Sequence, residues 1–383
     1  DPVSSPSSFR DDMESTLTSD GRNLWLTVVG RNDPKADARA ETLAYRAGKW
    51  RRLGGRFPVE WGYYVHLAIR RSAGGGRPGA CLGYMARGDV PAVRCFERGR
   101  WRSKLLPRRF RKMTLYGLRA DGARLTALFA GARKAGGSKK AGSKRTTVVR
   151  LARLARGRFV PMKARLTLRG PRVVSFVAST SGHRGPLEID VQDMNRSTRW
   201  VATRRAGGWD RSAPTPSLPS GVYMGGWLST AIRADDGALY FPRTDFYDTE
   251  HYLGRTEGHG DLRVLRLGGD GWSTVGGAPV SRGTGTAQGG IYPVGDRIWA
   301  VWQENDSEGI AFGGLFRTRV FAARIDPAGT GFDRELELWS GRTYFPGSVQ
   351  AVRHRGGTVF LYDRQLTAKG GLRATVDFSH PDG

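Results

Sequence analysis

The sequence predicts an all-β protein that folds as a single β-propeller, because a turn followed by an aromatic residue recurs about every 50 to 65 residues. Two more observations agree with this prediction: the chain holds 54 glycines and 11 tryptophans, and no long segment has helical periodicity. We expect seven four-stranded blades, or six if one weak unit is misread. The clearest copies of the repeat are Ala47-Gly48-Lys49-Trp50, Arg98-Gly99-Arg100-Trp101, Ala206-Gly207-Gly208-Trp209 and Gly269-Asp270-Gly271-Trp272.

Strand-like segments separated by Gly, Asp and Pro turns define the blades. For the fourth blade we expect strands at residues 165–168, 172–179, 200–205 and 209–212. The seventh blade, at residues 348–353, 358–363 and 372–378, lacks an outer strand. We therefore expect residues 1–12 to form an arm that closes this blade, and residues 13–383 to form the propeller, since closure removes exposed strand edges.

The only two cysteines, Cys81 and Cys95, lie in strands joined by a tight turn at residues 88–91. Antiparallel pairing would bring them opposite each other, so we predict a disulfide and an extracytoplasmic location. Two buried free thiols are the alternative. The chain contains no apolar run of 18 or more residues, and therefore no predicted transmembrane helix.

The segment Gly269-Asp270-Gly271-Trp272-Ser273 resembles part of the Asp-box turn of the sialidase-type, BNR-like propellers. The preceding Ser-x-Asp and the N-terminal Arg-Ile-Pro signature are absent, so the resemblance implies the fold rather than the activity. The chain also loosely resembles propeller polysaccharide lyases and glycosidases, which use His, Tyr and Arg. That resemblance implies candidate roles for His66, His183, His251, Tyr252 and His259.

The formal net charge of +27 is concentrated in one half of the chain. Residues 1–210 carry 44 Lys and Arg against 16 Asp and Glu, whereas residues 211–383 carry 18 against 19. This asymmetry predicts a one-sided field that attracts polyanions. The proposed polyanion-binding residues lie in a Gly/Ser/Lys-rich segment: Lys134, Lys139, Lys140, Lys144 and Arg145. A solubilising loop in an Arg-rich protein is the alternative. No sequence-specific nucleic-acid motif is present.

Aromatic residues concentrate in the predicted connections between an outer strand and the next inner strand. Such rings beside glycines can stack on sugar faces, so we expect ligand binding there. Rings that plug the channel mouth are the alternative. The ligand-binding candidates are Trp61, Tyr63, Tyr223, Trp227 and Tyr344.

The richest polar cluster spans residues 244–252 and 257–261, which we expect to be a loop of blade five. A carboxylate pair with a Tyr or His could perform general acid–base chemistry on a glycosidic bond, with Asp248, Glu250, His251 and Glu304 as catalytic candidates. Oxygen ligands could instead bind Ca²⁺, with Asp245, Asp248, Glu250 and Asp306 as candidates. A hydrated loop with local ion pairs is the third interpretation.

Three functional hypotheses follow. The first is a secreted binding or scaffold protein for an acidic polysaccharide or another extracellular polyanion. The second is a polysaccharide-active enzyme, a glycoside hydrolase or lyase, with its site on the upper face of the propeller. The third is a structural subunit with protein partners at the cell surface. The sequence leaves open whether the protein is an enzyme.

Overall fold

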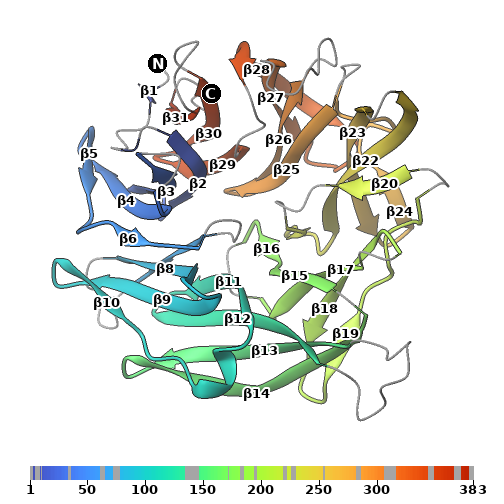
Figure 1. The fold of residues 1–383 in the computed structure, drawn as a ribbon. Helices are drawn as coiled ribbons and strands as arrows, with labels where there is room; N and C mark the ends of the chain where they lie inside the picture. The colour runs from blue at the N-terminus through green and yellow to red at the C-terminus, as the bar shows by residue number, and fades with distance from the viewer. Residues whose placement is uncertain are drawn as a thin grey trace.

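Seven four-stranded blades stand around a common axis, so the predicted propeller of seven blades is confirmed (Figure 1). A parallel bridge between Gly260 and Thr286 joins blades 5 and 6 into one sheet. The architecture comes from a computed structural model. It describes residues 3–4, 9, 11–32, 36–60, 65–71, 78–133, 146–170, 172–181, 185–193, 196–218, 222–225, 230–252, 255–281, 286–305, 316–343, 349–365 and 372–378.

The first three blades follow one another along the chain, each starting with its innermost strand. Blade 1 contains β2 (Asp11–Ser19), β3 (Leu24–Arg31), β4 (Arg39–Arg46) and β5 (Lys49–Arg52), and β6 (Phe57–Pro58) pairs with β4. Blade 2 contains β7 (His66–Arg70), β8 (Gly79–Ala86), β9 (Val90–Glu97) and β10 (Arg100–Ser103). A 3-10 turn, η1 (Arg108–Phe110), precedes blade 3, which contains β11 (Thr114–Asp121), β12 (Arg124–Arg133), β13 (Thr146–Ala155) and β14 (Arg158–Arg169).

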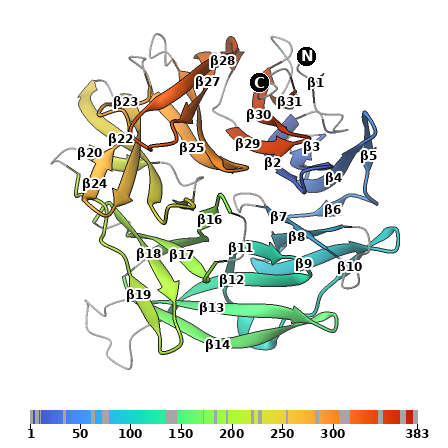
Figure 2. The same cartoon turned by 180° about the vertical axis from the view of Figure 1, so that it is seen from behind.

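The remaining blades complete the ring, as the view from behind also shows (Figure 2). Blade 4 contains β15 (Arg172–Phe176), β17 (Glu188–Asp193), β18 (Thr198–Arg204) and β19 (Trp209–Arg211). Blade 5 contains β21 (Ile232–Arg233), β22 (Leu239–Tyr252), β23 (Arg255–Gly268) and β24 (Gly271–Thr274), with β16 (Ala178–Ser179) and β20 (Val222–Gly225) added at its inner side. Blade 6 contains β25 (Thr286–Val294), β26 (Arg297–Asn305), β27 (Phe316–Ile325) and β28 (Phe332–Thr343). Blade 7 contains β29 (Val349–His354), β30 (Gly357–Gln365) and β31 (Leu372–Asp377).

The fourth strand of blade 7 comes from the other end of the chain. β1 (Val3–Ser4) pairs antiparallel with β31, placing Val3 opposite Val376 and Ser4 opposite Thr375. The inner strands also meet around the axis, since β2 contacts both β29 and β7. The ring therefore closes through the first and last blades together.

The repeated aromatic follows a hairpin turn that joins the third and fourth strands of a blade. In blades 1 to 3 the turns are Ala47-Gly48, Arg98-Gly99 and Arg156-Gly157, and both residues of each turn have positive φ. This is the type I′ geometry, which glycine adopts without strain. The aromatic that follows then packs between blades: Trp101 Nε1 donates to the Leu53 carbonyl of blade 1, and Trp209 Nε1 to the Arg165 carbonyl of blade 3.

Apolar side chains fill the space between neighbouring blades. Buried clusters occupy every interface around the ring, for example Phe110, Phe129 and Phe159 between blades 2 and 3. Because both faces of each sheet are covered in this way, strand segments such as 24–30 and 298–305 are buried without interruption.

Blade 4 differs from the sequence-based prediction. Residues 165–168 belong to β14, the outer strand of blade 3, and β15 is the innermost strand of blade 4. The second strand is β17, a segment that we had not predicted as a strand. Its sequence, Glu-Ile-Asp-Val-Gln-Asp, is acidic, yet all six residues are buried. The acidic side chains of Glu188, Asp190 and Asp193 are buried because each forms an ion pair with an arginine. A prediction based on hydrophobic patterns cannot detect a strand of this kind.

The polar cluster of blade 5 also differs from the prediction, because it is a β-hairpin rather than a loop. β22 and β23 are both 14 residues long and stay paired out to Thr249 and Glu257. The polarity of residues 244–252 favours a loop in a sequence-based prediction, whereas in the structure β22 and β23 satisfy each other's backbone groups by antiparallel pairing.

The predicted disulfide is present. Cys81 on β8 and Cys95 on β9 are opposite each other in the strand register and their sulfur atoms are bonded. Both residues belong to the apolar cluster between blades 2 and 3. The bond therefore fastens the central hairpin of blade 2 where it packs on blade 3.

Replacing both cysteines by alanine should lower the free energy of unfolding by about 3 kcal/mol, because the bond closes a loop of 14 residues in sequence separation. Urea unfolding of the parent and the double variant measures this difference. Reduction of the parent under denaturing conditions should give the same shift. Equal midpoints for the oxidised parent and the double variant would contradict a stabilising role.

Candidate functional site

Asp245, a candidate metal ligand, lies on β22 and is only 3% exposed. Arg243 Nε lies 2.6 Å from its Oδ1, and Arg263 Nε lies 3.0 Å from its Oδ2. Burial raises the pKa of Asp245, and the two arginines oppose that shift. The carboxylate is thus already neutralised by two guanidinium groups.

Glu304, a candidate catalytic residue, lies on β26 and is 2% exposed. Its Oε1 accepts a hydrogen bond from Trp302 Nε1 at 2.9 Å, and Arg319 approaches its Oε2 at 3.4 Å. These contacts hold Glu304 inside blade 6. Within the described ranges, no three His, Cys, Asp or Glu side chains gather into a group that could hold a metal ion.

The remaining candidates fall into two groups: residues on strands whose backbone alone is described, and residues outside the described ranges. The backbones of Asp248, Glu250 and His251 lie on β22 and that of Tyr223 lies on β20. Trp61, Tyr63, Trp227, Tyr344, Asp306 and the basic set Lys134, Lys139, Lys140, Lys144 and Arg145 lie outside the described residues. Their roles stay predictions.

The innermost strands carry titratable groups, one of which the sequence did not reveal. Glu14 follows a register shift in the pairing of β2 with β3, and its Oε1 accepts a hydrogen bond from the Val65 amide at 2.9 Å. The neighbouring Ser15 hydroxyl donates to Asp363 Oδ1 of blade 7 at 3.2 Å. These contacts join blades 7, 1 and 2. Nothing in the sequence marks the shift that directs Glu14.

Two of these groups have strongly displaced pKa values. Burial, assisted by the charge of Asp363, raises the pKa of Glu14 from 4.5 to about 7. Burial lowers the pKa of His66, on β7, from 6.5 to about 4, against a hydrogen bond to the Leu115 backbone. Near pH 6 both side chains are therefore neutral in the folded protein.

A strongly basic groove lies between blades 2 and 3, with a volume of about 790 Å³. Five cationic side chains line it and only one carboxylate, that of Glu97. The cations are Arg70, Arg100, Arg102, Lys104 and Arg156. Most come from the strands of blade 2, and Arg156 comes from the hairpin turn of blade 3.

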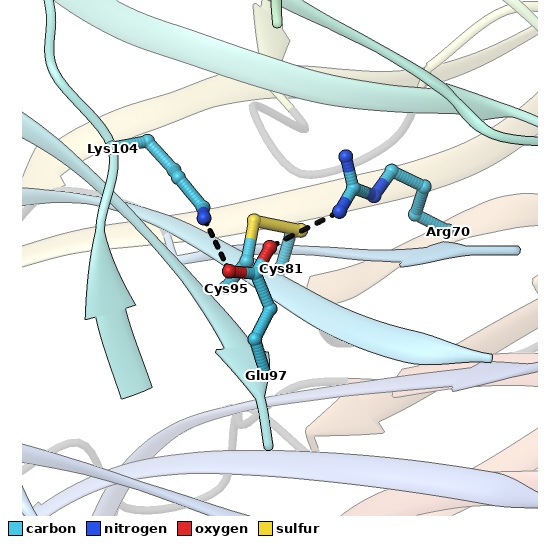
Figure 3. The surroundings of a disulfide bond; sticks show 5 residues. All are labelled: Arg70, Cys81, Cys95, Glu97 and Lys104. Atoms are coloured by element: carbon cyan, nitrogen blue, oxygen red, sulfur yellow. Dashed lines mark hydrogen bonds and ion pairs between the residues drawn. A yellow bond between two sulfur atoms is a disulfide. The ribbon is translucent and has the colours of Figure 1, made fainter. Parts of the chain in front are cut away.

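Strand pairing brings Arg70 and Glu97, two of the residues that line this groove, close together. Arg70 on β7 is opposite Gly79, and Glu97 on β9 is opposite Arg100. Because Gly79 has no side chain, Arg70 can cross β8, and its guanidinium lies 3.1 Å from Glu97 Oε1. Lys104 Nζ lies 2.6 Å from Glu97 Oε2 on the other side (Figure 3).

Positive charge exceeds negative charge in this groove. Glu97 is the one carboxylate that pairs with both Arg70 and Lys104 in this groove. The Lys104 side chain is only 7% exposed. Arg100, Arg102 and Arg156 have no carboxylate partner in the part of the chain that the structure describes. Arg100 and Arg156 are exposed to solvent. Guanidinium groups bind sulfate and carboxylate through paired hydrogen bonds, so this groove is suited to an anionic ligand.

A second groove, of about 460 Å³ between blades 4 and 5, is closer to neutral. Its arginines are largely satisfied by the protein: Arg205 pairs with Asp210, Arg233 with Glu188 and Arg266 with Asp236. Arg211 instead lies over the ring of Trp200, 4.3 Å from its centroid. The groove between blades 2 and 3 is therefore the stronger anion site.

No protein-family model matches the chain, and no curated protein matches it. Among solved structures it is similar to a puromycin-hydrolyzing peptidase of Mycobacterium tuberculosis, with 14% identity over 94% of this chain and a TM-score of 0.41. The chain spans 60% of that peptidase. It is also similar to the six-bladed fucose-recognising lectin of Aleuria aurantia, with 11% identity, 89% of this chain, 99% of the lectin and a TM-score of 0.44.

A subtype N11 neuraminidase-like protein of A/flat-faced bat/Peru is a third similar structure, with 11% identity, 98% of this chain, 92% of that protein and a TM-score of 0.42. The propeller fold that the resemblance to sialidase-type propellers implied is present, as the seven blades of the structure show. These likenesses concern the fold alone. As expected from the sequence, none of the described residues forms a helix of the length and hydrophobicity needed to cross a bilayer.

Glu14 and His66 should give opposite pH dependences of stability. Between about pH 4.5 and 7 the folded state keeps a proton on Glu14 that the unfolded state has lost, so this group makes stability fall as pH rises. Between about pH 4 and 6.5 the unfolded state binds a proton on His66 that the folded state lacks, so this group makes stability rise.

Relative to the parent, Glu14→Gln should therefore become more stable with rising pH over this range, and His66→Asn less stable. Each difference should change by at most about 1.4 kcal/mol per pH unit. Urea unfolding from pH 4 to 7.5 measures both, and the double variant should show neither trend. Parallel pH profiles for the parent and both single variants would contradict the assigned protonation states.

Proposed function

We propose that the protein is a secreted propeller that binds acidic polysaccharide through the groove between blades 2 and 3. The observation that carries the proposal is the composition of this groove, which five cationic side chains and a single carboxylate line. The excess of positive charge in residues 1–210 supports it, because blades 1 to 3 and most of blade 4 lie within that range. Such a field attracts a polyanion and orients its approach.

The disulfide favours an oxidising compartment over the cytosol, where thiols are kept reduced. The Cys81–Cys95 bond also holds β8 and β9 together beside the groove, so β7 and β10, which pair with these strands and carry three of the groove's cations, have a rigid base. A preorganised set of cations binds an anion with a smaller entropic cost.

Reversing two of the groove's cations that lack a carboxylate partner among the described residues should weaken this binding strongly. In Arg100→Glu with Arg102→Glu, affinity for immobilised heparin or polygalacturonate at 0.1 M salt should fall at least tenfold. The slope of log affinity against log salt should also become shallower, because fewer counterions are exchanged. Surface plasmon resonance over a salt series measures both quantities.

The matched control is Arg22→Glu with Arg297→Glu, which changes net charge equally but lies on blades 1 and 6, away from the groove. It should retain most of the affinity. Equal losses in the two double variants would show that only net charge matters, and binding by neither the parent nor the control would overturn the proposal.

Removing the single carboxylate should strengthen binding. Glu97 competes with an anionic ligand for Arg70 and Lys104, so Glu97→Gln should raise heparin affinity a few-fold. The slope of log affinity against log salt concentration should become steeper by about one unit, because one more ligand charge is neutralised. Thermal unfolding should show some loss of stability, because the buried Lys104 loses its partner. Unchanged or weaker binding by a folded Glu97→Gln variant would place the ligand elsewhere.

A further inference from the structure

A second basic cavity, called the upper cavity below, is lined by blade 3 and by the connector that precedes it. The groove between blades 2 and 3 described above is called the lower groove. The volume of the upper cavity is about 380 Å³, and it is lined by Lys112, Arg150 and Arg165 together with Met113, Gly131, Ala132 and Val148. No acidic residue lines it. Lys112 and Arg165 are exposed and have no carboxylate partner among the described residues.

The two cavities share one face of β13. Alternate residues of a strand point to the same side, so Arg150, Ala152 and Leu154 have a common orientation. Ala152 packs in the apolar cluster that contains Cys81 and Cys95, which identifies this side as the one facing blade 2. Arg150 lines the upper cavity and Leu154 lines the lower groove. Four residues of strand separate them, a distance of about 13 Å.

The connector between blades 2 and 3 runs alongside both cavities. It begins with Leu105, which is 71% exposed and whose carbonyl accepts a hydrogen bond from the Phe159 amide at 2.8 Å. Arg108 and Arg109 follow, both exposed, while Phe110 is fully buried and anchors the segment. The connector then reaches Lys112 at the upper cavity. Positive charge therefore continues from one cavity to the other.

We propose that this interface binds a linear acidic polysaccharide lengthwise, so that an internal segment of the polymer bridges the lower groove and the upper cavity. The inference rests on the proposed function and specifies its ligand: a chain with repeated sulfate or carboxylate groups, rather than a terminal sugar. Two anion sites at a fixed separation gain affinity when one chain occupies both, since the second contact is intramolecular.

A nucleic acid suits these cavities less well. Single strands bind strongly where bases stack on exposed aromatic rings. Trp101 is the only aromatic residue lining either cavity, within the described ranges. Its indole packs against Phe57 and Phe96 and donates to the Leu53 carbonyl, so its ring is already engaged.

The test uses heparin oligosaccharides of defined length, from the disaccharide to the dodecasaccharide, in isothermal titration calorimetry at constant salt. The upper variant is Lys112→Glu with Arg165→Glu, the lower variant is Arg100→Glu with Arg102→Glu, and the control is Arg22→Glu with Arg297→Glu. We expect the parent to bind the longest oligosaccharides at least tenfold more tightly than the disaccharide, which is too short to reach both cavities. The upper variant should remove that gain and leave disaccharide binding within twofold of the parent.

The outcomes separate the two proposals. If the parent binds the disaccharide and the lower variant does not, but length adds nothing or the upper variant keeps the full gain, the bridging inference is wrong and the lower groove stands. If no oligosaccharide binds at any length, the proposed function itself is wrong. If single-stranded DNA of equal charge binds as tightly as the dodecasaccharide, the assignment to polysaccharide is overturned.

Discussion

Apolar packing between neighbouring blades is the constraint on which the rest of this structure depends. No blade can bury its two faces alone, so each sheet is stable only with a neighbour on either side. The buried clusters around the ring satisfy this need, and the first and last blades must meet to complete it. The pairing of β1 with β31 links the two ends of the chain at that point.

The interface between blades 4 and 5 combines a smaller apolar cluster with buried charge. Asp190 is bonded to Arg199 and to the Ala231 amide, and Glu188 is bonded to Arg233. Buried ion pairs of this kind require complete partners, because an unpaired charge inside a protein is costly. Asp245 and Glu304 follow the same rule in blades 5 and 6, where arginines neutralise them. These four carboxylates of blades 4 to 6 thus form ion pairs inside the protein.

The interface between blades 2 and 3 distributes its charge in the opposite way. Its centre is apolar and carries the disulfide, whereas its lower and upper margins carry cations with few carboxylates. At the lower margin, Glu97 holds Arg70 and Lys104 in place. This arrangement, an apolar interface with basic margins, underlies the proposed polymer site and explains why net charge alone does not define it.

The sequence by itself predicted the fold class, seven blades with six as the alternative, and the disulfide, because each depends on local signals: turns before an aromatic, β-rich segments, and two cysteines across one hairpin. It failed at β17 and at the hairpin of β22 and β23, where polar residues are buried or paired across strands. Only the tertiary structure decided the candidate site. Arg70, the pair Glu97 and Lys104, and Arg156 come from three separate segments of the chain, and they converge because strand register and blade stacking bring them together. Charge counts identify a basic half of the chain, but whether a given charge is neutralised depends on which side chain lies beside it in three dimensions.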